Sequence, residues 1–239
     1  MKSARFWKAS AAAALGVAIT LALGFWQLDR ARQKQALYDA IEEMETAPAL
    51  DQRELAAIKN IADVMHRPVR LRGTWVPAAT VFLDNRQMNG KPGFFVVTPL
   101  KLEGSERAVA VQRGWVQRNF QDRAALPAVE TPAGVVDVQG RLAPPPAKLY
   151  EFSGAAPGPI RQNLDLAAFR AETKLALLDG SVVETGPASQ GLLRDWPEAD
   201  SGVDKHYGYM VQWWALSALI AILYVWFQFI APRRRAARA

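Results

Sequence analysis

The sequence predicts a membrane protein of the α+β class, in which two transmembrane helices flank one antiparallel domain of β-barrel or sandwich type with a few helices. Three observations support this fold class. Residues 9–28 and 209–230 form two apolar runs without Asp, Glu, Lys or Arg. Each run is long enough for an α-helix to cross the ~30 Å hydrocarbon layer. Between the runs, several short segments alternate apolar and polar side chains, which is typical of strands in a barrel or sandwich.

The first apolar run, residues 9–28, has two interpretations. Trp26 near its exit is typical of a transmembrane helix, because tryptophan is enriched at membrane interfaces. A cleaved signal peptide is the alternative, with Ala22-Leu23-Gly24 as a small-x-small cleavage site. We favour an uncleaved helix, because the run is longer than the apolar segment of a usual signal peptide.

Small side chains occur on both apolar runs. On the first run they recur at every fourth position, at Ala12, Gly16, Thr20 and Gly24. The second run offers a similar patch at Ser217 and Ala221. Because small residues let helix backbones approach closely in lipid, we expect these two patches to pack against each other.

Basic residues are concentrated at the two ends of the chain. They precede the first run or follow the second, at Lys2, Arg5, Lys8, Arg233, Arg234, Arg235 and Arg238. The net charge is +6, but the rest of the chain holds all 23 acidic residues and is nearly neutral. This distribution argues against a nucleic-acid partner and predicts cytoplasmic tails at residues 1–8 and 231–239. The main domain, residues 29–208, is then expected in the periplasm.

Residues 29–208 have the size of one domain. The helical pattern of the first run continues through residues 30–44, and a second helix is expected at 51–64 with Asp51 as its cap. A short helix is expected at 165–174. Strands are expected at residues 69–75, at 81–83 before a turn at 84–85, at 94–100, 108–116 and 135–142, with one or two more in 175–185.

Enzyme templates match the sequence poorly, and we expect no catalytic residue. The chain has no cysteine nucleophile and two histidines, His66 and His206, so a Ser-His-Asp triad would need one of these. His66 lies at a predicted helix-to-strand junction, where a structural role is expected. No glycine-rich phosphate-binding motif is present. Without cysteine, a metal site would need His, Met or oxygen ligands.

His206 lies at the entry to the second apolar run, where water meets lipid. A neutral imidazole at this place can bind a metal or haem iron while an apolar ligand lies against the helix. Residues three, four and seven positions later share its helix face. They are Tyr209, Met210 and Trp213, which would form an aromatic and apolar wall. The alternative is an interfacial polar residue beside an aromatic belt, which needs no ligand.

Four sequence blocks occur in a characteristic order. They are residues 23–30 (LGFWQLDR), 67–75 (RPVRLRGTW), 111–116 (VQRGWV) and 206–216 (HYGYMVQWWAL). Together with the two apolar runs, these blocks resemble the Surfeit locus protein 1 family across nearly the whole chain. One departure is Gln112, which stands where asparagine is more usual in the family.

The resemblance implies a role in building haem-copper cytochrome c oxidase in the bacterial inner membrane. It implies that the chain binds haem a, helps to deliver or insert it into the catalytic subunit, and works with haem A synthase. The family's candidate haem ligand is the histidine at the entry to the second span, which corresponds to His206. Lys205 and Arg30 would then pair with the haem propionates, although simple snorkelling at the interface is the alternative for each. The resemblance does not specify an oligomeric state.

Other motif residues are expected to support the fold or contact a partner, namely Gly24, Trp26, Gln27, Arg113, Gly114 and Trp115. Gly24 permits close helix approach, and Gly114 permits backbone geometry that a side chain would block. Two other functions remain open. The chain could be a scaffold that binds oxidase subunit intermediates without haem, or a membrane-bound periplasmic enzyme for which the sequence nominates no residue.

Overall fold

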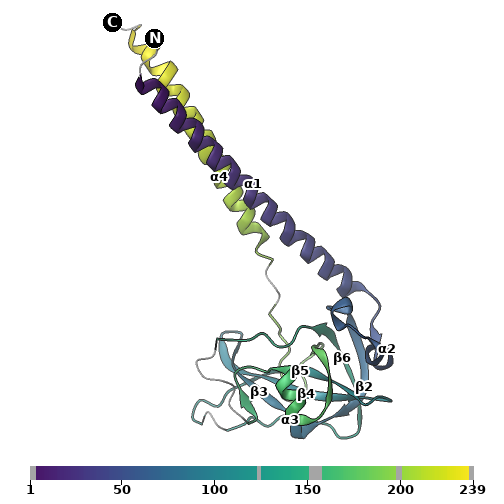
Figure 1. Cartoon of the computed structure of the whole chain (residues 1–239). Coiled ribbons are helices and arrows are strands. Elements are labelled where there is room, and N and C mark those ends of the chain that lie inside the picture. Colours follow the sequence, from purple (N-terminus) through teal and green to yellow (C-terminus); the bar gives the residue numbers. More distant parts are fainter. Residues whose placement is uncertain (1–3, 123–124, 151–157, 198–200, 237–239) are drawn as a thin grey trace. The chain divides into compact units, whose positions relative to one another are not determined.

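The computed structural model describes residues 4–122, 125–150, 158–197 and 201–236 (Figure 1). The chain divides into two compact units. One consists of the terminal segments, residues 1–40 and 199–239, and the other of residues 41–198. The first is a pair of helices and the second is rich in β-strands.

The helical unit contains two helices that are long and apolar enough to cross a membrane, judged by length and composition. Helix α1 (Ala4–Thr46) runs without a break through the first apolar run and residues 30–44, so the predicted helical continuation of the first span is confirmed. Helix α4 (Val203–Val225) covers most of the second run. It continues through a π-helical turn, η3 (Trp226–Ile230), into α5 (Ala231–Ala236).

Helices α1 and α4 lie side by side and antiparallel (Figure 1). Their facing residues, which we call the helix seam, are buried or half-buried and are spaced alternately three and four positions apart. The seam consists of Ser10, Ala13, Val17, Thr20, Gly24, Gln27 and Ala31 on α1, and Val203, His206, Met210, Trp213, Ser217, Ile220 and Tyr224 on α4. Alternating steps of three and four are the heptad spacing of paired helices.

The predicted packing of small residues is correct in part. Gly24 and Ser217 are buried in the helical unit, whereas Ala12 and Ala221 are exposed. Helix geometry explains the difference, because a stripe at every fourth residue turns by about 40° per step around a helix of 3.6 residues per turn. A stripe with steps of three and four stays on one side. A polar contact joins α1 to α4 near one end of the seam, where the Ser10 hydroxyl lies 2.7 Å from the Tyr224 hydroxyl.

The second unit is a closed β-barrel with additional strands, as the sequence predicted. Its strands are β1 (Leu50–Asp51), β2 (Pro68–Trp75), β3 (Val81–Met88), β4 (Lys91–Leu102), β5 (Arg107–Gln117), β6 (Val135–Ala143), β7 (Ile160–Arg161) and β8 (Ala176–Glu184). They pair in the order β1-β2-β6-β8-β5-β4-β3-β7, and a further pairing of β2 with β4 closes the ring. The accompanying helices are α2 (Gln52–Ala57), η1 (Ile61–Val64), η2 (Pro77–Ala79) and α3 (Leu166–Thr173).

The sheet is mixed rather than wholly antiparallel. Strands β5 and β8 pair in parallel inside the barrel, and β1–β2 and β3–β7 are short parallel pairs. The alternation of apolar and polar residues in a strand reports which face is buried. It carries no information on the direction of the neighbouring strand, so the sequence pattern could not reveal these parallel pairs.

Strand β5 is buried on both faces from Ala108 to Trp115. On one face, Val109 and Val111 pack in the main core together with Val69, Leu71 and other barrel residues. On the other face, Ala108 and Ala110 belong to a second cluster that includes residues of α3. This two-sided burial makes β5 the central strand of the domain, and it carries the third sequence block.

Local signals in the sequence located most elements but not all of their ends. The Asp51 cap is confirmed, with a capping box to Glu54, but the predicted helix 51–64 is interrupted at Ile58 and divides into α2 and η1. The Asp165 cap of α3 is also confirmed. The predicted turn at residues 84–85 is wrong, because β3 continues through this point as a bulge with Asn85 in the left-handed region (φ 59°).

Candidate functional site

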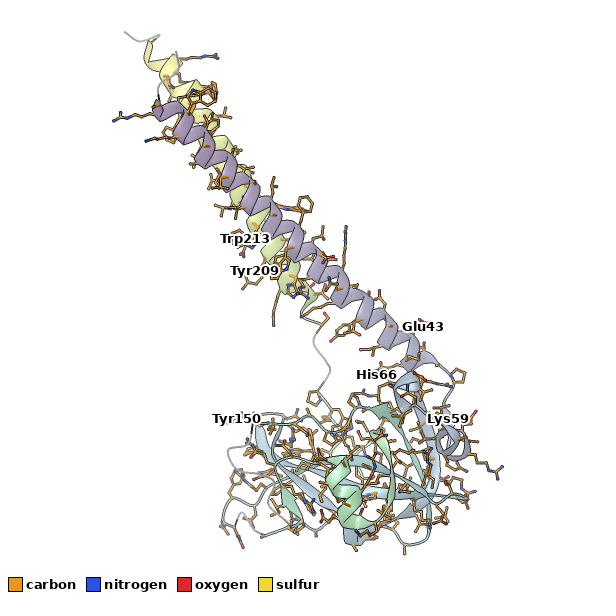
Figure 2. The ribbon with its side chains drawn as sticks, in the orientation of Figure 1. Glu43, Lys59, His66, Tyr150, Tyr209 and Trp213 are labelled. Carbon is orange, nitrogen blue, oxygen red and sulfur yellow. The ribbon has the colours of Figure 1, made fainter. Side chains whose placement is uncertain are left out.

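The two histidines have different environments. His66 lies between η1 and β2, in the left-handed region (φ 72°), and its backbone N–H donates to the Leu142 carbonyl at 3.1 Å. Burial lowers the pKa of its imidazole, with a further lowering by Arg141 that Glu45 opposes. Its Nδ1 is buried, with no hydrogen-bond partner within the described part of the chain. These features support the expected structural role of His66 (Figure 2).

His206 lies in the first turn of α4 and is half-buried. Its Nδ1 lies 2.7 Å from Oε1 of Gln27, a residue of α1 that is 9% exposed. A carboxamide oxygen only accepts hydrogen bonds, so in this arrangement Nδ1 carries the proton and donates. A neutral imidazole then keeps its lone pair on Nε2, which is the kind of atom that binds haem iron or a metal.

The residues predicted to form an apolar wall do not share one face. Met210 and Trp213 are half-buried in the helix seam beside His206, whereas Tyr209 is 53% exposed. Figure 2 labels Tyr209 and Trp213 on α4. The residue three positions after His206 lies about 60° away around the helix, but those four and seven positions after it lie within about 40°. The structure therefore places Met210 and Trp213 with His206, and Tyr209 on the outer surface.

Trp214, which the sequence analysis did not select, packs closely against α1. Its indole lies against Gly24, where a Cβ atom would overlap the ring. It also packs edge-to-face on Phe25, with ring centroids 5.4 Å apart. The expected role of Gly24 in close helix approach thus has a specific partner. Gly24 and Gln27 lie one turn apart on α1, so this contact adjoins the His206–Gln27 hydrogen bond.

The cations predicted near the haem propionates are exposed. The Arg30 guanidinium lies 5.8 Å from the ring centroid of Trp26, and its Nη1 donates to Gln33 Oε1 at 3.3 Å. Trp26 is itself exposed, as expected for an aromatic residue at a membrane interface. Lys205 is exposed on the first turn of α4, directly before His206. Propionate binding by Arg30 and Lys205 stays a prediction.

Arg113 is fully buried in the β-barrel. Its Nη1 donates to Thr131 Oγ1 at 2.8 Å, and its Nη2 donates to the Glu130 carbonyl and to Gln190 Oε1, both at 2.6 Å. The guanidinium lies 4.8 Å from the ring centroid of Trp75. Burial lowers the pKa of Arg113. Because these contacts are internal to the domain, they support the role in the fold that the sequence predicted.

Gly114 and Trp115 on β5 pack against and hydrogen-bond to the segment around Leu193. A Cβ atom on Gly114 (φ 155°) would lie 2.7 Å from both Leu192 Cβ and the Leu193 carbonyl oxygen. Trp115 exchanges two backbone hydrogen bonds with Leu193, and its Nε1 donates to the Arg86 carbonyl at 2.9 Å. The predicted requirement for glycine at position 114 therefore has a steric cause.

Sequence reasoning missed two interactions. Glu184 and Arg194 form a largely buried ion pair at 2.7 Å, and Arg194 Nε also donates to the Arg113 carbonyl at 2.9 Å. Burial raises the pKa of the Glu184 carboxyl, and Arg194 and Arg113 oppose this rise. No sequence signal links these residues. The second is the His206–Gln27 hydrogen bond, which the heptad spacing on the two helices would have indicated.

No metal-binding cluster of three or more His, Asp or Glu residues occurs within the described ranges. A single imidazole such as that of His206 can still hold a group that carries its own metal. The site fits a group that needs one protein ligand together with apolar surroundings, as haem does. This fit rests on the anchored Nδ1 of His206 and on Met210 and Trp213 beside it.

Comparison with known proteins identifies the family. A family model described as the SURF1 family matches residues 14–218, which include the barrel and most of both helices. The chain belongs to the SURF1 family. The SURF1 match includes all four sequence blocks up to residue 216.

Several SURF1 relatives match parts of the chain or most of it. A SURF1-like protein of Rickettsia bellii is 32% identical over 99 residues, which are 41% of this chain and 39% of the relative. A SURF1-like protein of Drosophila melanogaster is 27% identical over 239 residues, covering 90% of this chain and 75% of the relative. The Saccharomyces cerevisiae protein named cytochrome oxidase assembly protein SHY1 is 29% identical over 98 residues, covering 41% of this chain and 25% of the relative. The chain thus spans about two fifths of the length of the Rickettsia bellii relative.

Proposed function

We propose that this SURF1 chain is a non-enzymatic assembly factor for haem-copper cytochrome c oxidase. It acts in the bacterial inner membrane, binds haem a through His206, and assists delivery of the haem to the oxidase catalytic subunit. The family membership and the name of the yeast relative support the assembly role. The observation that supports haem binding is the hydrogen bond between His206 Nδ1 and Gln27, which leaves Nε2 as the basic nitrogen.

The location of His206 suits a lipophilic haem. Haem a carries a hydroxyethylfarnesyl tail, which partitions into membrane rather than water. His206 lies in the first turn of a helix that is apolar enough to span a membrane, so an iron ligand and an apolar helix surface adjoin each other. Lys205 and Arg30 offer positive charge for the propionates. Haem a is the cargo in this proposal. The protein would supply one nitrogen ligand for its iron and an apolar surface for its macrocycle and tail.

A delivery protein must also release its cargo. The chain contains two histidines. His66 belongs to the β-barrel unit, where its contacts support a structural role. A single histidine from this chain would hold iron less firmly than two axial histidines. Weak holding suits transfer, because the accepting subunit needs only to bind the haem more tightly than the carrier does.

The second candidate function is a scaffold that binds oxidase subunit intermediates without haem. It is supported by large apolar side chains on the surface of the β-barrel unit, where Phe120 is 64% exposed and Leu126 is 43% exposed. Leu126 also lines a hollow of about 310 Å³ together with Arg118 and neighbouring residues. Exposed apolar groups of this kind are common at protein-binding surfaces.

Complementation of a strain that lacks this gene tests the proposal. We expect His206→Ala to reduce the haem a content of purified cytochrome c oxidase, while His66→Ala at similar protein abundance leaves it near the wild-type level. Phe120→Ser, which changes only a surface group of the barrel, serves to test the scaffold. Normal oxidase haem in His206→Ala together with failed assembly in Phe120→Ser would replace haem delivery by the scaffold function.

A further inference from the structure

We infer that Gln27 is a positioning residue for His206, and that its uncharged amide orients the haem-binding nitrogen without the further strengthening of the iron bond that a carboxylate would give. The inference rests on the proposed function. It begins from one contact, the 2.7 Å distance between Gln27 Oε1 on α1 and His206 Nδ1 on α4. The two residues are far apart in sequence, so the pairing of the helices creates the site.

The hydrogen bond selects one tautomer of His206. A neutral imidazole carries its proton on either Nδ1 or Nε2, and only the first form can donate to Gln27 Oε1. A single hydrogen bond of ordinary strength favours the donating form roughly two- to tenfold over the other. In this form, Nε2 offers its lone pair to iron without any loss of a proton. Gln27 therefore prepares the ligand atom before haem binds.

The surroundings of Gln27 restrict its motion. Gly24, one turn earlier on α1, lies against the indole of Trp214, and Ala31, one turn later, is fully buried. Gln27 therefore lies between two buried positions of α1. Because the amide is also nearly buried, rotation of the side chain away from His206 would leave the Nδ1–H without this acceptor.

The chemical nature of the partner matters for release. Histidines that bind metals often donate their second N–H to a carboxylate, which raises the basicity of the ligand nitrogen. Gln27 presents an uncharged oxygen at this place. The nearby acidic residue of α1, Asp29, instead accepts a hydrogen bond from Gln33 Nε2 at 2.7 Å. The structure thus provides orientation without the added negative charge, which suits a protein that must give up its haem.

The first test needs no haem. The full-length protein, purified in detergent without haem and with ¹⁵N-labelled histidine, is compared with Gln27→Leu and with the control Gln212→Leu, which changes an exposed glutamine of α4. The ¹⁵N shifts of His206 report which ring nitrogen carries the proton. We expect Nδ1–H in the wild type and in Gln212→Leu, and a shift toward Nε2–H in Gln27→Leu. The same tautomer in all three proteins would overturn the positioning role.

The second test concerns release, with haem a as the probe and excess apomyoglobin as the acceptor. We expect Gln27→Leu to lose haem about tenfold faster than the wild type, the lower end of the effect usual for partners of metal ligands. Gln27→Glu should lose it more slowly, since a carboxylate strengthens the ligand. Release at the wild-type rate from both variants would overturn the role in release, even where the tautomer shifts.

The two tests separate this inference from the proposed function. Haem that binds equally well to His206→Ala would contradict the proposed function and, with it, the role of Gln27 in release. The tautomer measurement would still decide whether Gln27 positions His206. Gln27→Glu guards against a misfolded Gln27→Leu, because it keeps a polar side chain with an acceptor of the same length.

Discussion

Replacing Arg113 with methionine tests the account of the barrel core. The substitution keeps a long unbranched side chain but removes three short hydrogen bonds to Thr131, Glu130 and Gln190. Hydrogen bonds from a charged donor contribute about 1.5–3 kcal/mol each. Arg113→Met also removes the free-energy cost of burying a cation, which offsets several kcal/mol of this loss. We expect the free energy of unfolding to fall by about 3 kcal/mol, near the cost of breaking a buried charged network.

The assay is urea unfolding of the full-length protein in detergent, followed by tryptophan emission. Trp75, one of the eight tryptophans of the chain, lies against the guanidinium, so its emission contributes a signal from this part of the barrel. The control is Arg72→Met on β2, which removes exposed ion pairs to Glu103 and Asp137 and should cost less than about 1 kcal/mol. If Arg113→Met were no less stable than Arg72→Met, Arg113 would not stabilise the barrel as argued.

Three further predictions concern other parts of the molecule. Gly24→Val should weaken the pairing of α1 with α4, because the valine side chain would overlap Trp214. Disulfide cross-linking between cysteines introduced on the two helices should therefore fall. The control Ala12→Val changes an exposed residue and should leave the cross-linking unchanged. Gly114→Ala should lower the free energy of unfolding by about 2 kcal/mol, because the new methyl group would overlap Leu192 and Leu193. A urea unfolding midpoint equal to that of the wild type would refute this cause. The pKa of His66 is lowered in the folded state, so its contribution to stability is present above the unfolded pKa and is lost as pH falls toward the folded pKa. His66→Asn should therefore reduce the loss of stability on mild acidification, and an unchanged pH profile would contradict this.

Much of the fold could be predicted from local patterns. Two runs without charge located the helices α1 and α4, and alternation of side chains located the barrel strands. Carboxylates that cap helices were correctly found at Asp51 and Asp165 because their effect is confined to one turn. The parallel pairing of β5 with β8 could not be predicted, since it depends on how distant segments meet.

The candidate site could be predicted only in part for the same reason. The sequence selected His206 and the family motif selected Gln27, but only the packing of two helices joins them. A search for heptad spacing on both helices would have placed Gln27 and His206 in one seam. The burial of Arg113 was harder to foresee, because arginine is seldom fully buried and its acceptors come from separate loops.

The visible absorption spectrum of the protein purified in detergent from cells that make haem A tests the central claim most directly. The wild type is compared with His206→Ala and His66→Ala at equal protein concentration. The account predicts a haem a spectrum in the wild type and in His66→Ala, and its loss in His206→Ala. A wild type without haem, or equal haem in all three proteins, would contradict haem binding at His206.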